Sequence, residues 1–173
     1  MQAIILAADG VEDRELLYPC DRLREEGVRV DIAAPEPGPI AGRHNCYPIE
    51  ATQAFFDMWG ADYYDVLVLP GGTAPERIRH NGRVHALIRD MLGAGKVVVA
   101  IGHGVETLVS LDVLDGRRAT CAPGVRDELE LAGAQYVDEP VVVDGNLITG
   151  RGVDDLPHIC REMIEALRPQ IED

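Results

Sequence analysis

The chain has 173 residues, about the length of one ordinary domain, and 46% of them are apolar, as in a globular protein. Thirty acidic residues against sixteen basic ones give a formal net charge of −14, which repels phosphate backbones and anionic lipid surfaces. We therefore expect a single domain over residues 1–173, with neither nucleic acid nor membrane as its partner.

Short apolar runs alternate along the chain with apolar residues at helical spacing, which predicts alternating strands and helices. Residues 36–48 are rich in proline and glycine and are typical of a loop or a short hairpin. In chain order the predicted elements are a strand over 3–7, a helix over 15–26, strands over 28–35 and 65–72, a helix over 83–92, a strand over 96–101, helices over 103–111 and 125–132, a hairpin over 141–149 and a helix over 154–167.

This alternation predicts an α/β fold, a three-layer sandwich around a mostly parallel sheet with a small antiparallel hairpin. Ligands of such sheets bind outside the carboxyl ends of the strands. That rule selects four segments of this chain: residues 9–12, the loop after Pro35, residues 71–76 and residues 102–104.

The segment "VVVAIGHGVETL" over 97–108 runs a buried strand straight into a helical pattern. Many α/β enzymes mount a nucleophile at such a turn, because the turn lifts one side chain clear of the sheet. The residue at the tip of this elbow is Gly102, which leaves the nucleophile position vacant.

Five further residues at these strand ends are candidates for function, and each has a structural alternative. Glu12 is either a first-turn carboxylate that stabilises a helix or a proton donor and acceptor. Gly71 and Gly72 form either a tight turn or a pair of backbone donors for an oxyanion. Glu76 belongs to a helix start or to the site, and His103 is a structural or a catalytic histidine beside the tip.

The sequence predicts no metal and no cofactor. Cys20, Cys46, Cys121 and Cys160 lack CxxC spacing and are expected to be free thiols of a cytoplasmic protein. "GHGVET" lacks the third glycine of a dinucleotide-binding loop. The opening "MQAIILAADG" lacks the basic flank of a signal peptide, and no run approaches the roughly 20 apolar residues of a membrane span.

Taken together, the segments "DGVEDREL", "DVLVLPGGTAPERIR", "VVVAIGHG" and "PGVRDELELAGAQYVDEPVVVDGNLITGRGVDDLP" resemble the DJ-1/PfpI family, also called ThiJ/PfpI. The long carboxyl-terminal segment resembles the PfpI branch. The resemblance implies a flavodoxin-like sandwich that forms a homodimer or a larger homo-oligomer.

The resemblance also implies roles for single residues. The family's elbow usually reads Ala-Ile-Cys-His-Gly, so Gly102 stands at the position of its nucleophilic cysteine. Glu12 matches the acid that hydrogen-bonds this thiol, His103 matches the following histidine, and Glu76 matches an acid that reaches the histidine of a neighbouring subunit. Gly71 and Gly72 match the backbone donors that face the nucleophile.

A second departure from the family concerns the wall of the site. Ala122-Pro123-Gly124 stands where PfpI-like relatives often have Tyr-Pro-Gly, which implies a roomier pocket. Cys121 is the thiol nearest to the elbow by motif, and the sequence does not give its direction.

Three functions fit these residues. The first, which the presence of these site residues favours, is an enzyme with a retained pocket for a small-molecule substrate and thiol-independent acid–base chemistry through Glu12 and His103, of the hydratase, hydrolase or glyoxalase-like class. The second is a non-catalytic protein of stress protection, chaperone-like association or ligand binding. The third is a cysteine enzyme inactivated by a cysteine-to-glycine replacement. Without the cysteine, no thioester or hemithioacetal can form at the elbow.

Overall fold

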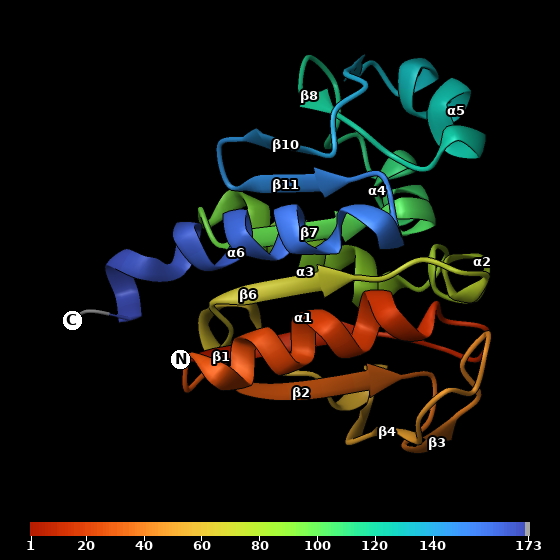
Figure 1. The fold of residues 1–173 in the computed structure, drawn as a ribbon, viewed down its shortest axis with the longest axis vertical. Coiled ribbons are helices and arrows are strands. Elements are labelled where there is room, and N and C mark those ends of the chain that lie inside the picture. The colour runs from red at the N-terminus through yellow and green to blue at the C-terminus, as the bar shows by residue number, and fades with distance from the viewer. Residues whose placement is uncertain (172–173) are drawn as a thin grey trace.

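Residues 1–171 are the part of the chain that the computed structural model describes, and they are built around a seven-stranded sheet (Figure 1). Each pair of neighbouring strands is parallel except β10 and β11, which form the predicted hairpin. The predicted mostly parallel α/β fold is thus confirmed. In spatial order the strands are β10 (Val141–Asp144), β11 (Leu147–Gly150), β7 (Val97–Ile101), β6 (Val66–Leu69), β1 (Gln2–Leu6), β2 (Arg29–Ala34) and β5 (Gln53–Ala54).

Helices cover both faces of this sheet and give the fold three layers. α1 (Asp13–Glu25) and α6 (Leu156–Ile171) lie side by side on one face, and α3 (Gly82–Gly93) lies behind the other (Figure 1). Every residue of β6 and β7 is buried, because these central strands are covered on both sides.

Smaller elements surround the layers. β3 and β4 form an antiparallel hairpin around the segment predicted as loop or short hairpin. The two-residue strands β8 and β9 carry too few residues for a periodic pattern to reveal them. These elements are β3 (Gly38–Ile40), β4 (Ile49–Ala51), α2 (Ala74–Ile78), α4 (Glu106–Val109), β8 (Arg118–Ala119), α5 (Arg126–Leu131), β9 (Gln135–Tyr136) and the 3₁₀ turns η1 (Phe55–Asp57), η2 (Ala61–Tyr63), η3 (Gly102–Val105), η4 (Pro123–Val125) and η5 (Val153–Asp155).

The helix boundaries differ from the predictions by one short turn in several places. α1 begins two residues before the predicted start, at Asp13. The helix predicted over 103–111 is instead a 3₁₀ turn followed by α4, which ends at Val109. α6 begins at Leu156, after the 3₁₀ turn η5, two residues later than the predicted start at 154. Apolar spacing marks the buried face of a helix and says little about its ends.

The parallel strands end at one edge of the sheet, where α2, α4 and the start of α1 also lie (Figure 1). The four segments selected in the sequence follow the ends of β1, β2, β6 and β7. Within residues 1–171, no helix has the length and apolar character required to span a bilayer.

Candidate active site

The elbow after β7 has the predicted geometry. Ile101 is extended, and Gly102 then turns with a φ of +59° into the 3₁₀ turn η3. This left-handed conformation costs a residue with a Cβ about 1 to 2 kcal/mol, which glycine avoids. The chain therefore makes a sharp strand-to-helix turn with no side chain at its tip.

Glu15 is the carboxyl group that lies beside this tip. Its side chain is on the first turn of α1, only 5% of the residue is exposed, and Oε2 accepts a 2.7 Å hydrogen bond from the Gly71 N–H. A Cβ added to Gly102 would stand 2.9 Å from Glu15 Oε1. The Glu15 carboxyl thus reaches into the space that an elbow side chain would take.

Burial raises the pKa of Glu15 to about 8, because desolvation disfavours the charged form. The hydrogen bond from Gly71 opposes this effect, the charge of Glu12 adds to it, and Arg43 again opposes it. Glu15 therefore changes its charge within the neutral to mildly basic range.

Glu12, which the sequence points to as the acid beside the elbow, lies elsewhere. It is the residue before α1, it is buried, and its Oε2 is 3.2 Å from Nε2 of the exposed His44. The signal that identifies Glu15 is its spacing. Glu15 precedes Pro19 by four residues and Leu23 by eight, so an acid occupies the buried stripe of the helix.

The first glycine after β6 packs tightly against Glu15, and the second packs against the backbone of residues 10–12. A Cβ on Gly71 would lie 2.7 Å from Glu15 Oε2 and 2.9 Å from the His103 N, so only glycine leaves room here. The Gly71 N–H is already donated to Glu15. Gly72 has a φ of +75°, and its N–H makes no hydrogen bond within residues 1–171. An oxyanion role for the pair stays a prediction.

His103 has a partner on its own chain. Its Nδ1 lies 2.7 Å from Glu106 Oε1, while 43% of its side chain is exposed. Its Cε1 is 3.6 Å from the point where a Cβ on Gly124 would stand, which places the ring beside η4. The structure therefore brings His103 and the elbow together, with Glu106 as an acid that the sequence pattern did not single out.

The structure separates the remaining candidates. Ala122 is close to the elbow, because its N–H donates to the Gly102 carbonyl at 3.2 Å. Glu76 is exposed on α2, and its carboxylate makes no hydrogen bond or ion pair within residues 1–171. Cys121 is buried, and burial raises the pKa of its thiol to about 11, so it stays protonated at neutral pH.

A cavity of about 450 Å³ adjoins the elbow. The Arg151 carbonyl is 3.5 Å from the point where a Cβ on Gly102 would stand, and a Cβ on Gly152 would lie 3.6 Å from Glu15 Oε1. Both residues line the cavity, whereas Glu15, Gly102 and His103 do not, so the cavity lies beside the elbow and does not include it. The Arg151 guanidinium is held by Asp155 and Asp138.

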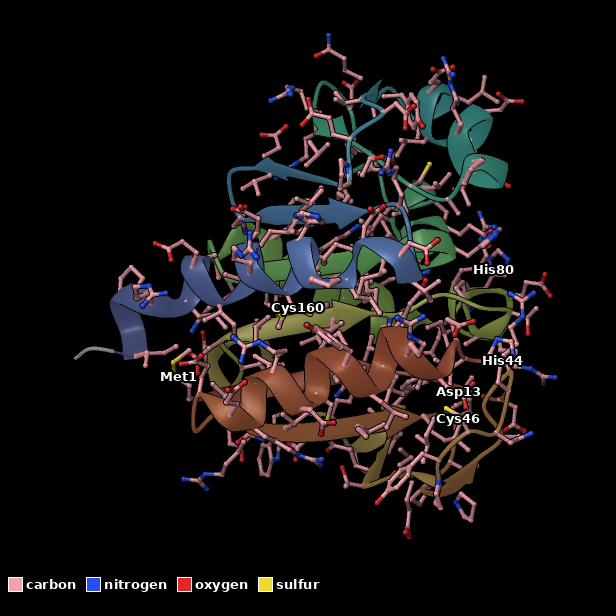
Figure 2. All side chains as sticks on the ribbon, in the orientation of Figure 1. Met1, Asp13, His44, Cys46, His80 and Cys160 are labelled. Atoms are coloured by element: carbon pink, nitrogen blue, oxygen red, sulfur yellow. The ribbon has the colours of Figure 1, made fainter. Side chains whose placement is uncertain are left out.

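A second buried carboxyl lies next to the site. Asp13 is 0% exposed and accepts backbone N–H groups from His44 at 2.8 Å and Cys46 at 3.0 Å. Figure 2 shows these three residues together at the start of α1. Burial acts to raise the pKa of Asp13, but the N–H donors outweigh it, and the pKa is lowered. Within residues 1–171, no group of three or more His, Cys, Asp or Glu side chains is arranged to hold a metal ion.

The family model described as "DJ-1/PfpI family" matches residues 1–166 of the chain. The chain belongs to the DJ-1/PfpI family. A deglycase of Thermococcus kodakarensis is 44% identical to it over 168 residues, which cover 97% of this chain and all of the relative. The deglycase PfpI of Pyrococcus furiosus is 43% identical over the same share of both chains.

A solved structure supports the same assignment to the DJ-1/PfpI family. A two-domain protein of Anabaena variabilis, with DJ-1/ThiJ/PfpI-like and ferritin-like domains, is 32% identical with a TM-score of 0.92. The match covers 96% of this chain and 48% of that protein, so this chain corresponds to about half of its length. The DJ-1 flavodoxin-like fold implied by the sequence is thus confirmed.

Proposed function

We propose that the chain is an enzyme that carries out acid–base chemistry on a small carbonyl compound without a thiol. In this proposal Gly102 stands where family members carry the nucleophilic cysteine. Glu15 takes the acid–base role that the sequence analysis assigned to Glu12, and His103 is the second proton carrier. Relatives at about 44% identity are named deglycases, which is consistent with a carbonyl substrate.

The observation that carries the proposal is the place of the Glu15 carboxyl at the empty elbow. Oε2 accepts the Gly71 N–H, so the proton of the neutral form sits on Oε1, which faces Gly102. With a pKa of about 8, this carboxyl can donate a proton near neutral pH and then act as a base. A group of this kind serves proton transfer without a covalent intermediate.

A glyoxalase-like reaction illustrates what this arrangement can do. In a 2-oxoaldehyde hydrated at its aldehyde carbon, the Glu15 carboxylate removes the proton from that hydrated carbon. The resulting enediolate takes a proton back at the neighbouring carbon, and the product is a 2-hydroxy acid. One carbon is oxidised and its neighbour is reduced within the same molecule, so no external oxidant or reductant is needed.

The test compares the protein with Glu15→Gln, Glu12→Gln and Gly102→Cys on glyoxals and on small amides and nitriles. General acid–base catalysis contributes about 10²- to 10⁴-fold. We therefore expect activity in the unmodified protein, a loss of at least about 100-fold in Glu15→Gln, and little change in Glu12→Gln, which removes a neighbouring carboxylate that contacts His44. The rate should rise with pH up to about 8, where the pKa of Glu15 lies.

Two results would contradict the proposal. Activity that appears only in Gly102→Cys would mean that the site depends on the missing thiol. No activity in any form, together with suppression of client aggregation, would support the non-catalytic alternative.

A further inference from the structure

His103 lies beside an acid of its own chain, and this pair defines how the histidine carries protons. We propose that Glu106 is the positioning residue of His103, and that it holds the ring in the form with the proton on Nδ1 and the free electron pair on Nε2. The catalytic part of this inference rests on the proposed function. The position of the proton on the ring does not depend on the proposed function, and it can be measured separately.

The local fold places the two side chains together. His103 is in the 3₁₀ turn η3, and Glu106 begins α4 three residues later, so both project from the same face of the continuous turn. Glu106 Oε1 lies 2.7 Å from Nδ1, and only 14% of the Glu106 side chain is exposed. The hydrogen bond is therefore short and largely shielded from water.

Arg79 holds the other oxygen of Glu106. Its Nη1 lies 3.6 Å from Glu106 Oε2, and its Nη2 donates to Glu128 Oε2 at 3.1 Å. Arg79 follows α2 and Glu128 is in α5, so the guanidinium joins elements on both sides of α4. Arg79 Nε is buried without a hydrogen-bond partner within residues 1–171, so the guanidinium contacts these two acids through Nη1 and Nη2. The ion pair with Arg79 holds the Glu106 carboxylate in place.

A carboxylate only accepts hydrogen bonds, so Nδ1 must be the donor in this pair. The other ring nitrogen, Nε2, then carries the electron pair and makes no hydrogen bond within the described part of the chain. When Nε2 takes a proton from a substrate or a water, the positive charge on the ring is stabilised by Glu106, and the proton can be returned from the same atom. Glu106 thus acts through His103 and does not contact the reacting atoms.

This arrangement differs from the one implied by the family resemblance, in which Glu76 reaches the histidine of a neighbouring subunit. In this chain Nδ1 is already occupied by Glu106. An acid from another subunit could bond only to Nε2, the atom that proton transfer requires. We infer that the acid partner of His103 is supplied within the chain.

The experiment is ¹⁵N NMR of the histidine rings in the full protein without substrate, for the unmodified chain, Glu106→Gln, Glu106→Asp and Glu76→Gln. The neutral ring of the unmodified His103 is expected in the Nδ1–H form. Glu106→Gln offers an amide N–H to Nδ1 and should shift the neutral ring towards the Nε2–H form. Glu106→Asp keeps the negative charge and should retain more of the Nδ1–H form than Glu106→Gln. Glu76→Gln, a matched change at an exposed acid, should leave the ring as it is.

An unmodified His103 in the Nε2–H form would overturn the inference, as would a shift in Glu76→Gln with none in Glu106→Gln. If the proposed activity exists, Glu106→Gln should lower kcat by about 10-fold or more with little change in KM, because the ring no longer presents its free electron pair. If no activity exists, the NMR result still decides whether Glu106 holds the ring. The failure of the proposed function is therefore distinguishable from the failure of this inference.

Discussion

Asp13 and Glu15 stand two residues apart on the first turn of α1, and both are almost fully buried, yet their pKa values are moved in opposite directions. Asp13 accepts two backbone N–H groups and its pKa is lowered. Glu15 accepts one, from Gly71, and its pKa is raised to about 8. The pKa of each carboxyl group therefore reflects a balance between burial and the donors that face it. The donors outweigh burial at Asp13, whereas burial outweighs the single N–H donor at Glu15, the carboxyl beside the elbow.

The largest expected effect concerns the pH dependence of stability due to Glu15. Its pKa in the folded protein lies above the ordinary value of 4.5. Its contribution to the stability of the fold is therefore complete below pH 4.5 and is lost as the pH rises towards and through about 8. At about 1.4 kcal/mol per pH unit, the unmodified protein should lose up to about 4 kcal/mol between pH 5 and pH 8 relative to Glu15→Gln. Urea unfolding of both proteins across this range measures the difference. If the stabilities of the two proteins changed in parallel with pH, the Glu15 carboxyl would be charged throughout this range.

Asp13→Ala should destabilise the fold at neutral pH by about 3 kcal/mol, because two charge-assisted hydrogen bonds are lost and two N–H groups lose their acceptor. The sign of the pH effect is opposite to that of Glu15. The contribution of Asp13 is present above its ordinary pKa of 3.8 and is lost as the pH falls through the lower folded value. Unfolding at pH 7 measures the loss. A cost below 1 kcal/mol would mean that the loop over 42–46 is not held by this carboxylate.

Two glycines test how firmly each carboxyl is held. A Cβ on Gly42 would overlap the Asp13 carboxylate, which two N–H groups fix in place, so Gly42→Ala should cost about 2 to 3 kcal/mol. A Cβ on Gly102 would press on Glu15 Oε1, which can shift, so Gly102→Ala should cost about 1 kcal/mol, chiefly from its φ of +59°. Thermal unfolding of both variants ranks them. The reverse order would mean that Glu15 is the more rigid of the two.

The smallest expected effect on stability is that of replacing His44, the exposed residue that contacts Glu12. His44 Nε2 lies 3.2 Å from Glu12 Oε2, but 59% of the His44 side chain is exposed. Pairs of this kind contribute about 0.2 to 1 kcal/mol, so His44→Ala should change stability by less than 1 kcal/mol and leave the activity of Glu15 intact. A large loss of activity in His44→Ala would place the chemistry at Glu12 after all.

Much of the fold follows from the sequence, because continuous apolar runs such as 97–101 mark strands that must be covered on both faces. The elbow at Gly102 follows too, since a glycine directly after a buried strand suits a sharp turn. The sequence does not predict the two-residue strands β8 and β9 or the 3₁₀ turns, because these elements are too short to show a periodic pattern of apolar residues. The sequence also does not show which of the three acids of "EDRE" faces the elbow, because all three stand at the start of the predicted helix.

The sequence by itself determines a mostly parallel α/β sheet with an elbow whose tip has no side chain, because these features depend on the order of apolar residues and glycines along the chain. Only the tertiary structure decides which acid faces that tip. Glu15 is chosen over Glu12 and Asp13 by the direction of its side chain on α1 and by the Gly71 N–H that meets it from the end of β6. The same is true of Glu106, which reaches His103 because the chain turns from η3 into α4 between them. Which groups meet at a strand edge depends on how separate elements pack, and no local pattern encodes that meeting.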